Sequence, residues 1–185
     1  SGARARVDEL VRARVGRSDP RLGVAVTDLL AAHPNSVPAP VDLANNAGRW
    51  RVVHAPHIDT LSRLLLTTFD IEYCMDARGG MVSNVRYSSR VAGDGWLCTS
   101  GVVASDLAAP KVSIIWDRIW WLPGGEADAP PRASEGILRP IVQALGRAGF
   151  IEGLSVFPVR YLQDDLCIFN FQAFTVTTIR EEFGM

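Results

Sequence analysis

The sequence lacks the charge excess, the glycine-rich motifs and the long apolar runs that mark several large classes of protein. Its 19 basic and 20 acidic residues leave a net charge of -1, so no general positive field gathers a phosphate backbone, and nucleic acid is not an expected partner. Neither G-x-G-x-x-G nor G-x-x-x-x-G-K-[ST] occurs, so no dinucleotide or P-loop site is predicted and no cofactor is expected. No apolar run approaches the roughly 20 residues that span a bilayer.

Cysteine and histidine are scarce, which limits the metal and nucleophile chemistry open to the chain. Cys74, Cys98 and Cys167 are odd in number, far apart and next to apolar residues, so we expect unpaired thiols in a reducing compartment. His54 and His57 form the only close histidine pair and have no third ligand nearby in the sequence. With no G-x-S-x-G elbow and no Cys/His signature either, we predict no metal site and no catalytic residue.

One pair of acidic residues resembles the paired carboxylates of acid–base enzymes. Asp164 and Asp165 are adjacent, however, and adjacent residues in an extended strand point to opposite faces and cannot share one substrate. A turn at a strand entry, or a paired surface charge, is the simpler interpretation. The sequence therefore predicts a protein that is not an enzyme. A barrel-type isomerase with His54 and Tyr87 as its polar lumen residues is the third-ranked alternative.

The N-terminal region has apolar residues at helical spacing. This pattern runs over residues 7–32 and is interrupted at Ser18-Asp19-Pro20, which predicts two helices because proline after an Asp or Ser cap starts a helix. Residues 33–40 contain three prolines and predict an extended connector. We therefore expect a helical segment with its connector over residues 1–40 and the main domain over residues 41–185.

After the connector, apolar residues recur with a period of two, which is typical of half-buried strands. Gly or Pro residues separate most of these segments, as in chains of hairpins, so seven or eight antiparallel strands and a barrel or sandwich are predicted. Two helical patterns interrupt them: residues 58–68, expected to cross one barrel mouth, and residues 137–145, which follow a loop at 124–131. The predicted strands are residues 49–55, 71–76, 81–91, 96–104, 112–117, 119–122, 154–162 and 166–178.

Five tryptophans supply much of the aromatic area of this small chain: Trp50, Trp96, Trp116, Trp120 and Trp121. Filling a core is the simplest role for any one of these rings. Trp120 and Trp121 are consecutive, so in a strand one faces inward and the other outward. An outward ring would lie at the surface and indicate a lid, a partner or a membrane interface.

Two segments resemble the fibrillin (plastid lipid-associated protein) family. Residues 43–56 read LANNAGRWRVVHAP, which is similar to the opening strand of fibrillins and to the G-x-W start of lipocalins. Residues 153–168 read GLSVFPVRYLQDDLCI and resemble the family's Tyr-Leu-Asp-x-Asp-Leu-Arg-Ile segment. Gln163 and Cys167 stand where the family carries Asp and Arg, so any role of those charges is not carried over.

The resemblance implies a lipocalin-like antiparallel β-barrel with N-terminal helices and one or two short peripheral helices. It also implies a plastid (chloroplast) protein at thylakoid or plastoglobule surfaces that binds or organises apolar lipids without catalysis. Prenylquinones, carotenoids and acyl lipids are the ligands that the family suggests. The alternative is a structural subunit of a larger plastid protein complex, docked through its arginine-bearing N-terminal helices and the loop at 124–131, with no ligand in the barrel.

Strand alternation predicts which side chains face the barrel interior, since one face of each strand lies inside. The inward row is expected to combine aromatic rings, aliphatic side chains and one flexible methionine, which is typical of a small-molecule pocket. A solid packed core would use the same residue types. The predicted ligand-binding residues are Trp50, Val52, Tyr73, Met75, Val85, Tyr87, Trp96, Ile114 and Trp116.

Overall fold

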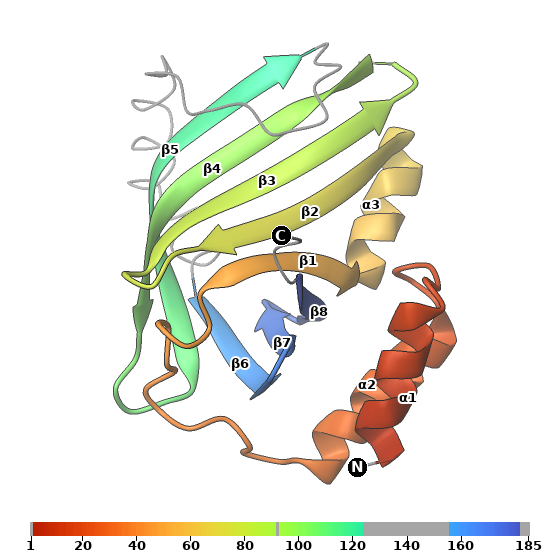
Figure 1. The fold of residues 1–185 in the computed structure, drawn as a ribbon. Coiled ribbons are helices and arrows are strands. Elements are labelled where there is room, and N and C mark those ends of the chain that lie inside the picture. The colour runs from red at the N-terminus through yellow and green to blue at the C-terminus, as the bar shows by residue number, and fades with distance from the viewer. Residues whose placement is uncertain (1, 92, 124–155, 182–185) are drawn as a thin grey trace.

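Eight antiparallel strands close into one barrel, in which each strand pairs with its neighbour in the chain and β8 pairs with β1 (Figure 1). The computed structural model describes residues 2–91, 93–123 and 156–181. The lipocalin-like antiparallel barrel that the sequence predicted is therefore confirmed. The strands are β1 (Gly48–His54), β2 (Thr67–Met75), β3 (Gly80–Ser89), β4 (Gly93–Ser105), β5 (Lys111–Pro123), β6 (Val156–Gln163), β7 (Leu166–Phe171) and β8 (Phe174–Glu181).

Three described helices lie outside the barrel: α1 (Gly2–Arg12), α2 (Pro20–Ala32) and α3 (Pro56–Leu65). The Asp19 carboxylate caps α2 by accepting from the Arg21 N–H at 2.9 Å, and Pro20 is the first helical residue, so the predicted break between two helices is confirmed. None of the described helices is long and apolar enough to cross a lipid bilayer. The predicted loop at 124–131 and helix at 137–145 lie outside the described residues.

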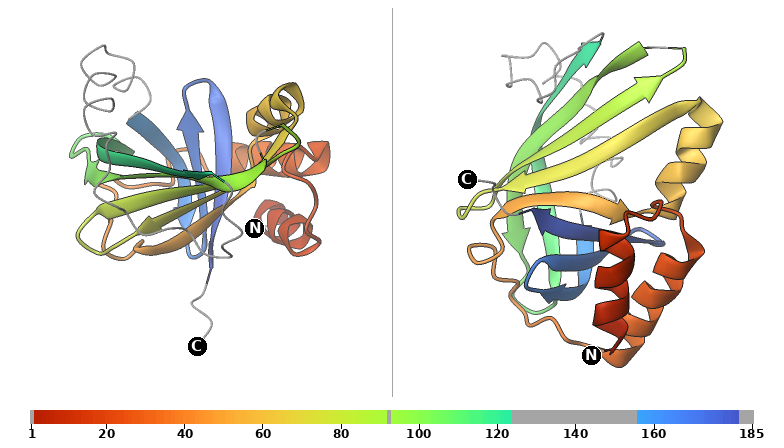
Figure 2. Two further views of the ribbon diagram at one scale, coloured as in Figure 1. Left: turned by 90° about the horizontal axis from the view of Figure 1, so that it is seen from above. Right: turned by 45° about the vertical axis from the view of Figure 1, so that its right-hand side comes forward.

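The strands pair over very different lengths, which gives the barrel one closed end and one extended wall. β1 and β2 pair only from Gly48–Met75 to Arg51–Glu72, and β5 pairs with β6 only through residues 111–113. In contrast, β2, β3, β4 and β5 pair with one another along almost their whole length. Figures 1 and 2 show these four strands continuing as a curved sheet beyond the closed part.

Several strand boundaries differ from the predicted ones: β2 begins at Thr67, within the predicted helical segment 58–68, and two predicted strands are divided differently. Residues 112–117 and 119–122 form the single strand β5, which has a bulge at Asp117 where the carboxylate accepts from Ser100 Oγ at 2.6 Å. Residues 166–178 form two strands, because the chain turns at Gln172 with φ of 52°. Neither Gly nor Pro marks that turn, so a reading based on such residues could not find it.

The turn between β2 and β3 was predicted from Arg78-Gly79-Gly80 and is present. Gly79 has φ of 85°, and a Cβ on it would lie 2.7 Å from the Val103 carbonyl oxygen, so a larger residue would be both strained and crowded. The Asp76 carboxylate accepts from the Arg78 and Gly80 N–H groups at 2.8 and 2.9 Å. These bonds fix where β3 starts and thus help to set its register against β2.

Apolar side chains pack on both sides of the barrel wall. On the outside, α1 and α2 bury one face of each helix against β6 and β7, in a core made of Val7, Leu10, Leu22, Ala25, Val26, Leu29, Tyr161, Leu166 and Ile168. The connector packs on the inner side, since Val37 and Val41 contact Val159, which lines the interior. Val41 and Leu43 also line the interior, so the connector contributes to the closed end of the barrel.

Candidate functional site

The barrel interior holds a cavity of about 440 Å³ lined by residues of all eight strands. Native cores leave few voids larger than a water molecule, whereas pockets for small molecules measure roughly 300–1,000 Å³. The inward side chains therefore do not fill the space that the wall encloses. The barrel has room for a small molecule or for part of a longer one.

Aromatic and aliphatic side chains make up most of the cavity wall. Tyr73 and Phe169 meet edge to face with ring centroids 6.2 Å apart, and Phe157 and Phe169 do so at 5.7 Å. These contacts hold the rings of β2, β6 and β7 in place around the empty space. Such a wall favours an apolar molecule, because water in it would find few hydrogen-bonding partners.

Three hydroxyl groups interrupt this apolar lining in one row. Tyr73 is paired with Ser83, and Ser83 with Thr99, in the registers of β2, β3 and β4, and all three residues line the cavity. None of the three hydroxyls hydrogen-bonds to another residue that the structure describes. Burial raises the pKa of Tyr73 to about 12, so its hydroxyl stays protonated at neutral pH. The row offers a ligand several hydrogen-bonding positions on one side of the cavity.

The first turn of α3 lies at the edge of the cavity, as expected for a helix across a barrel mouth. His57 and Ile58 line the cavity, and the His57 ring stacks on Phe174 with centroids 4.5 Å apart. Burial, and then the proximity of His54, lower the pKa of His57. This part of the rim is therefore uncharged at neutral pH, which suits an apolar ligand.

Most of the predicted ligand-binding residues face this cavity. Those that line it are Trp50, Val52, Tyr73, Met75, Ile114 and Trp116. Val85 and Tyr87 share their face of β3 with Ser83 but lie beyond the cavity, where the sheet extends past the closed barrel. Ser83, Thr99 and Phe157 line the cavity and were missed. Ser83 could have been found, because it alternates with Met81 and Val85 along one strand.

Trp96 was expected inside the barrel, and this prediction is wrong. Its register partner is Arg86, whereas the cavity-facing row of β3 contains Ser83, so Trp96 projects from the outer face. There it is buried with Cys98 and Trp120, and the Arg86 guanidinium lies 5.9 Å from its ring centroid. A shift of one residue in register exchanges the two faces of a strand, and the sequence does not define that register.

The two consecutive tryptophans have the reverse of the expected exposure. Trp120 projects from the outer face but is only 6% exposed, whereas Trp121 lies on the inner face of the extended sheet and is 57% exposed. The Trp121 indole donates to the Tyr87 hydroxyl at 2.7 Å. The exposed ring therefore lies on the concave side of the wall.

The isomerase alternative placed His54 inside the barrel, and this placement is also wrong. β1 has a bulge at Val53, which turns His54 toward α2, where a Cβ on Gly23 would lie 3.5 Å from the imidazole. Burial lowers the pKa of His54. Hence neither polar residue of the isomerase alternative, His54 or Tyr87, lines the cavity.

No three His, Cys, Asp or Glu residues come together as a metal site within the described ranges.

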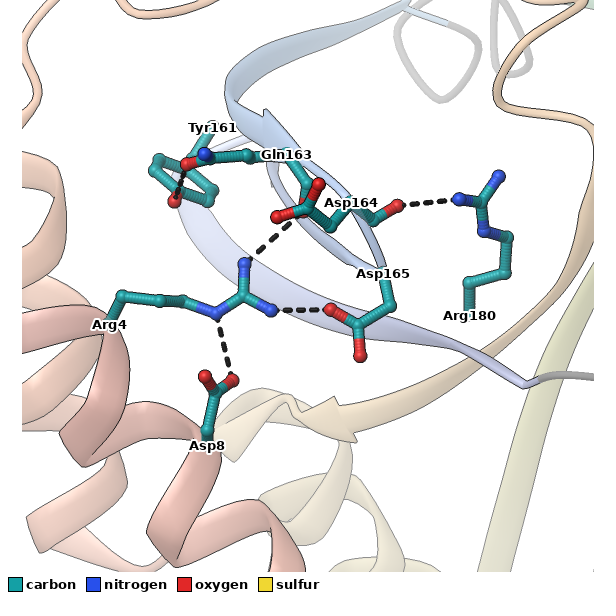
Figure 3. A network of polar contacts seen from close by, with 7 residues as sticks. All are labelled: Arg4, Asp8, Tyr161, Gln163, Asp164, Asp165 and Arg180. Atoms are coloured by element: carbon teal, nitrogen blue, oxygen red, sulfur yellow. Dashed lines mark hydrogen bonds and ion pairs between the residues drawn. The ribbon is translucent and has the colours of Figure 1, made fainter. Parts of the chain in front are cut away.

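Asp164 and Asp165 form the turn between β6 and β7, so their interpretation as a turn is confirmed. They are not in an extended strand, because Asp164 has φ of 55°. The Asp164 carbonyl accepts from Arg180 Nη2 at 2.8 Å, and the Asp165 carboxylate pairs with Arg4 (Figure 3). Neither residue lines the cavity, and both stabilise the turn.

Arg4 ties this turn to α1 (Figure 3). Its guanidinium donates to Asp8 at 2.8 Å and to the Gln163 carbonyl at 3.2 Å, in addition to Asp165. The side chain is only 17% exposed. A charge withdrawn from water to this extent is stable only with such partners, so the contact orients the helices on the barrel.

A second hollow of about 770 Å³ lies outside the barrel, between the α1–α2 turn and the outer wall. Side chains of both charges line it, including Arg14, Arg51, Asp70 and Glu181, and Arg51 pairs with Glu181 at 2.7 Å. A groove with paired charges of both signs does not select one class of ligand. The apolar cavity inside the barrel is therefore the better candidate site.

No family model matches the chain, and no curated protein matches it. The likeness to fibrillins therefore rests on residues 43–56 and 153–168. The fold itself is established by the strand pairing described above.

Proposed function

We propose that the chain is a carrier that holds one apolar molecule inside its barrel and performs no catalysis on it. The observation that carries this proposal is the cavity of about 440 Å³ behind a wall of aromatic and aliphatic side chains. A protein that used the barrel only as a rigid body would gain stability by filling this space, because empty cavities cost free energy.

The lining also supports a particular kind of ligand. An apolar body would contact the rings of Trp50, Trp116 and Phe169, while one carbonyl or hydroxyl group would bond to the row formed by Tyr73, Ser83 and Thr99. A prenylquinone, an oxygenated carotenoid or an acyl lipid has this composition. The resemblance to fibrillins supports the same ligands and a plastid location at thylakoid or plastoglobule surfaces.

A cavity-filling substitution tests the proposal directly. Ile71 lines the cavity on β2, so Ile71→Trp should place an indole in the space and weaken binding of N-phenyl-1-naphthylamine, measured by fluorescence titration, about tenfold or more. Ile115→Trp is the matched control, because Ile115 is 68% exposed. Circular dichroism should report a folded barrel for both variants.

Two results would contradict the carrier function. One is equal affinity of the probe for the wild-type chain and Ile71→Trp, which would place the probe outside the barrel. The other is no binding of any apolar probe to the wild-type chain. The second result would favour the alternative, a structural subunit of a larger plastid complex.

A further inference from the structure

Four large apolar side chains form a tip at one end of the molecule. The tip consists of Leu64, Leu65 and Leu66, at the end of α3, and Val91 in the turn between β3 and β4; they are 78%, 49%, 58% and 83% exposed. The Arg90 N–H donates to the Leu66 carbonyl at 3.3 Å and so joins the two segments. Both ribbon views place the end of α3 and the β3–β4 turn at the same end of the curved sheet (Figures 1 and 2).

The packing of α3 does not explain why these apolar side chains are exposed at its end. No residue of α3 is fully buried, so the helix does not anchor a core that would require leucine at its end. Single exposed apolar residues are ordinary, but a contiguous group marks a surface that another phase or molecule covers.

Two arginines lie next to the apolar residues of the tip in the sequence. Arg63 and Arg90 are exposed, and neither forms an ion pair with any residue in the described part of the chain. Residues 60–69 and 86–93 contain no Asp or Glu. The acids that flank these two segments are Asp59, Asp70 and Asp94: Asp59 pairs with Arg17 at 3.6 Å, Asp70 lies opposite Arg86 in the β2–β3 register, and Asp94 accepts from Ser88 at 2.6 Å.

We propose that this tip docks the protein on a lipid bilayer of net negative charge. Leucine and valine side chains would enter the boundary between head groups and acyl chains, while the two guanidinium groups bind lipid phosphates. A protein partner fits less well, because a stable interface buries about 1,200 Å² or more in total, and four side chains supply only a small part of that.

The position of α3 connects the tip with the cavity. The first turn of this helix, at His57 and Ile58, lines the cavity, and its last residues carry the tip. Docking would therefore bring the mouth of the barrel close to the bilayer. A ligand could then pass between the bilayer and the barrel. That transfer rests on the proposed carrier function, whereas membrane binding by the tip does not.

Sedimentation with vesicles tests the tip. The wild-type chain should bind vesicles of phosphatidylcholine mixed with phosphatidylglycerol more strongly than vesicles of phosphatidylcholine alone, and added salt should reduce the difference. The Leu64→Ser/Val91→Ser variant should bind the mixed vesicles about tenfold more weakly or worse. Leu107→Ser is the control, because Leu107 is 83% exposed in the turn after β4, at the other end of that strand, and its binding should not change.

Charge and cavity are tested separately. Arg63→Gln/Arg90→Gln should lose the preference for phosphatidylglycerol. In solution without vesicles, Leu64→Ser/Val91→Ser should bind N-phenyl-1-naphthylamine as the wild-type chain does, and Ile71→Trp should still bind vesicles, so the failure of one proposal is distinguishable from that of the other.

The proposal is overturned if the wild-type chain does not sediment with mixed vesicles, or if Leu107→Ser weakens binding as much as the tip variant. It is also overturned if the tip variant abolishes self-association of a wild-type chain that binds no vesicles. That last result would assign the tip to an interface between copies of the chain.

Discussion

The hydroxyl groups of Tyr73, Ser83 and Thr99 give a mostly apolar cavity a preferred orientation for its ligand. They come from adjacent strands, and their backbone hydrogen bonds fix the row in register. A flexible polar side chain would lose more conformational entropy when it binds. A single substitution in this row can therefore test whether the row recognises one polar group of the ligand.

Replacing Tyr73 with Phe should weaken binding of a quinone or hydroxylated lipid about fivefold, which corresponds to the loss of roughly one hydrogen bond. The stability of the unliganded chain should change little, since the Tyr73 hydroxyl bonds to no other described residue. The matched control is Tyr87→Phe, which removes the acceptor of the Trp121 indole but lies outside the cavity, so it should not change affinity. Calorimetric titration of both variants gives the comparison. Equal affinity of Tyr73→Phe and the wild type would remove Tyr73 from the site.

The thiols of Cys98, which is buried, and Cys167, which is half-buried, predict a loss of stability at alkaline pH. Burial raises the pKa of Cys98 to about 11 and that of Cys167 to about 12, from an ordinary value of 9.0. Because the folded-state pKa values are the higher ones, this contribution is complete below pH 9 and is lost as the pH rises toward 12. The free energy of unfolding in urea should fall over that range, and less steeply in Cys98→Ala/Cys167→Ala. Curves of equal slope would show that other groups cause the loss.

The N-terminal helices and the barrel depend on each other through two kinds of contact. The apolar faces of α1 and α2 pack on β6 and β7, and Arg4 joins α1 to the turn between those strands. Apolar packing alone would allow the helices to slide, because it has no fixed direction. The arginine bonds define one position.

Arg4→Met should therefore lower the free energy of unfolding by about 2 kcal/mol, because it keeps the aliphatic stem but removes charge-assisted hydrogen bonds in a poorly exposed site. Arg6→Met is the control on the same helix: Arg6 is 56% exposed and lies 3.5 Å from Glu9, so its loss should cost less than about 0.5 kcal/mol. Urea unfolding measures both. A similar small cost for the two variants would mean that Arg4 does not orient the helices.

The sequence predicted the elements better than the faces that they present. Periodicity of two, together with turn residues such as Gly79, was sufficient for an antiparallel barrel. Trp96 was assigned to the wrong side because alternation along β4 does not say which of its two faces points inward, and His54 because the bulge at Val53 reverses the alternation of β1. Bulges and registers depend on pairing between strands, which is not encoded within any single strand.

The cavity itself could not be predicted, because a solid core and a binding pocket use the same residue types. Of the predicted row, Trp50, Tyr73 and Trp116 line the cavity, whereas Val85 and Tyr87 do not. The difference arises because β3 continues beyond the closed part of the barrel. The depth of a residue in the barrel depends on the lengths over which all eight strands pair.

Three regions with different roles lie in different parts of the molecule. The α1–α2 pair stabilises the outside of β6 and β7, the apolar cavity lies inside the barrel, and the apolar tip lies at the far end of α3 (Figures 1 and 2). Substitutions in one of these regions should therefore leave the other two unchanged, since well-separated sites contribute independently.

Native mass spectrometry of the purified chain after exposure to a thylakoid lipid extract tests the carrier function most directly. We expect the wild-type chain to carry one apolar lipid per molecule, which organic extraction releases. The Ile71→Trp variant should be detected at the mass of the lipid-free chain, whereas Ile115→Trp should retain the lipid. A wild-type chain that has only its own mass, or that carries lipid equally well with Ile71 replaced by Trp, would contradict the account.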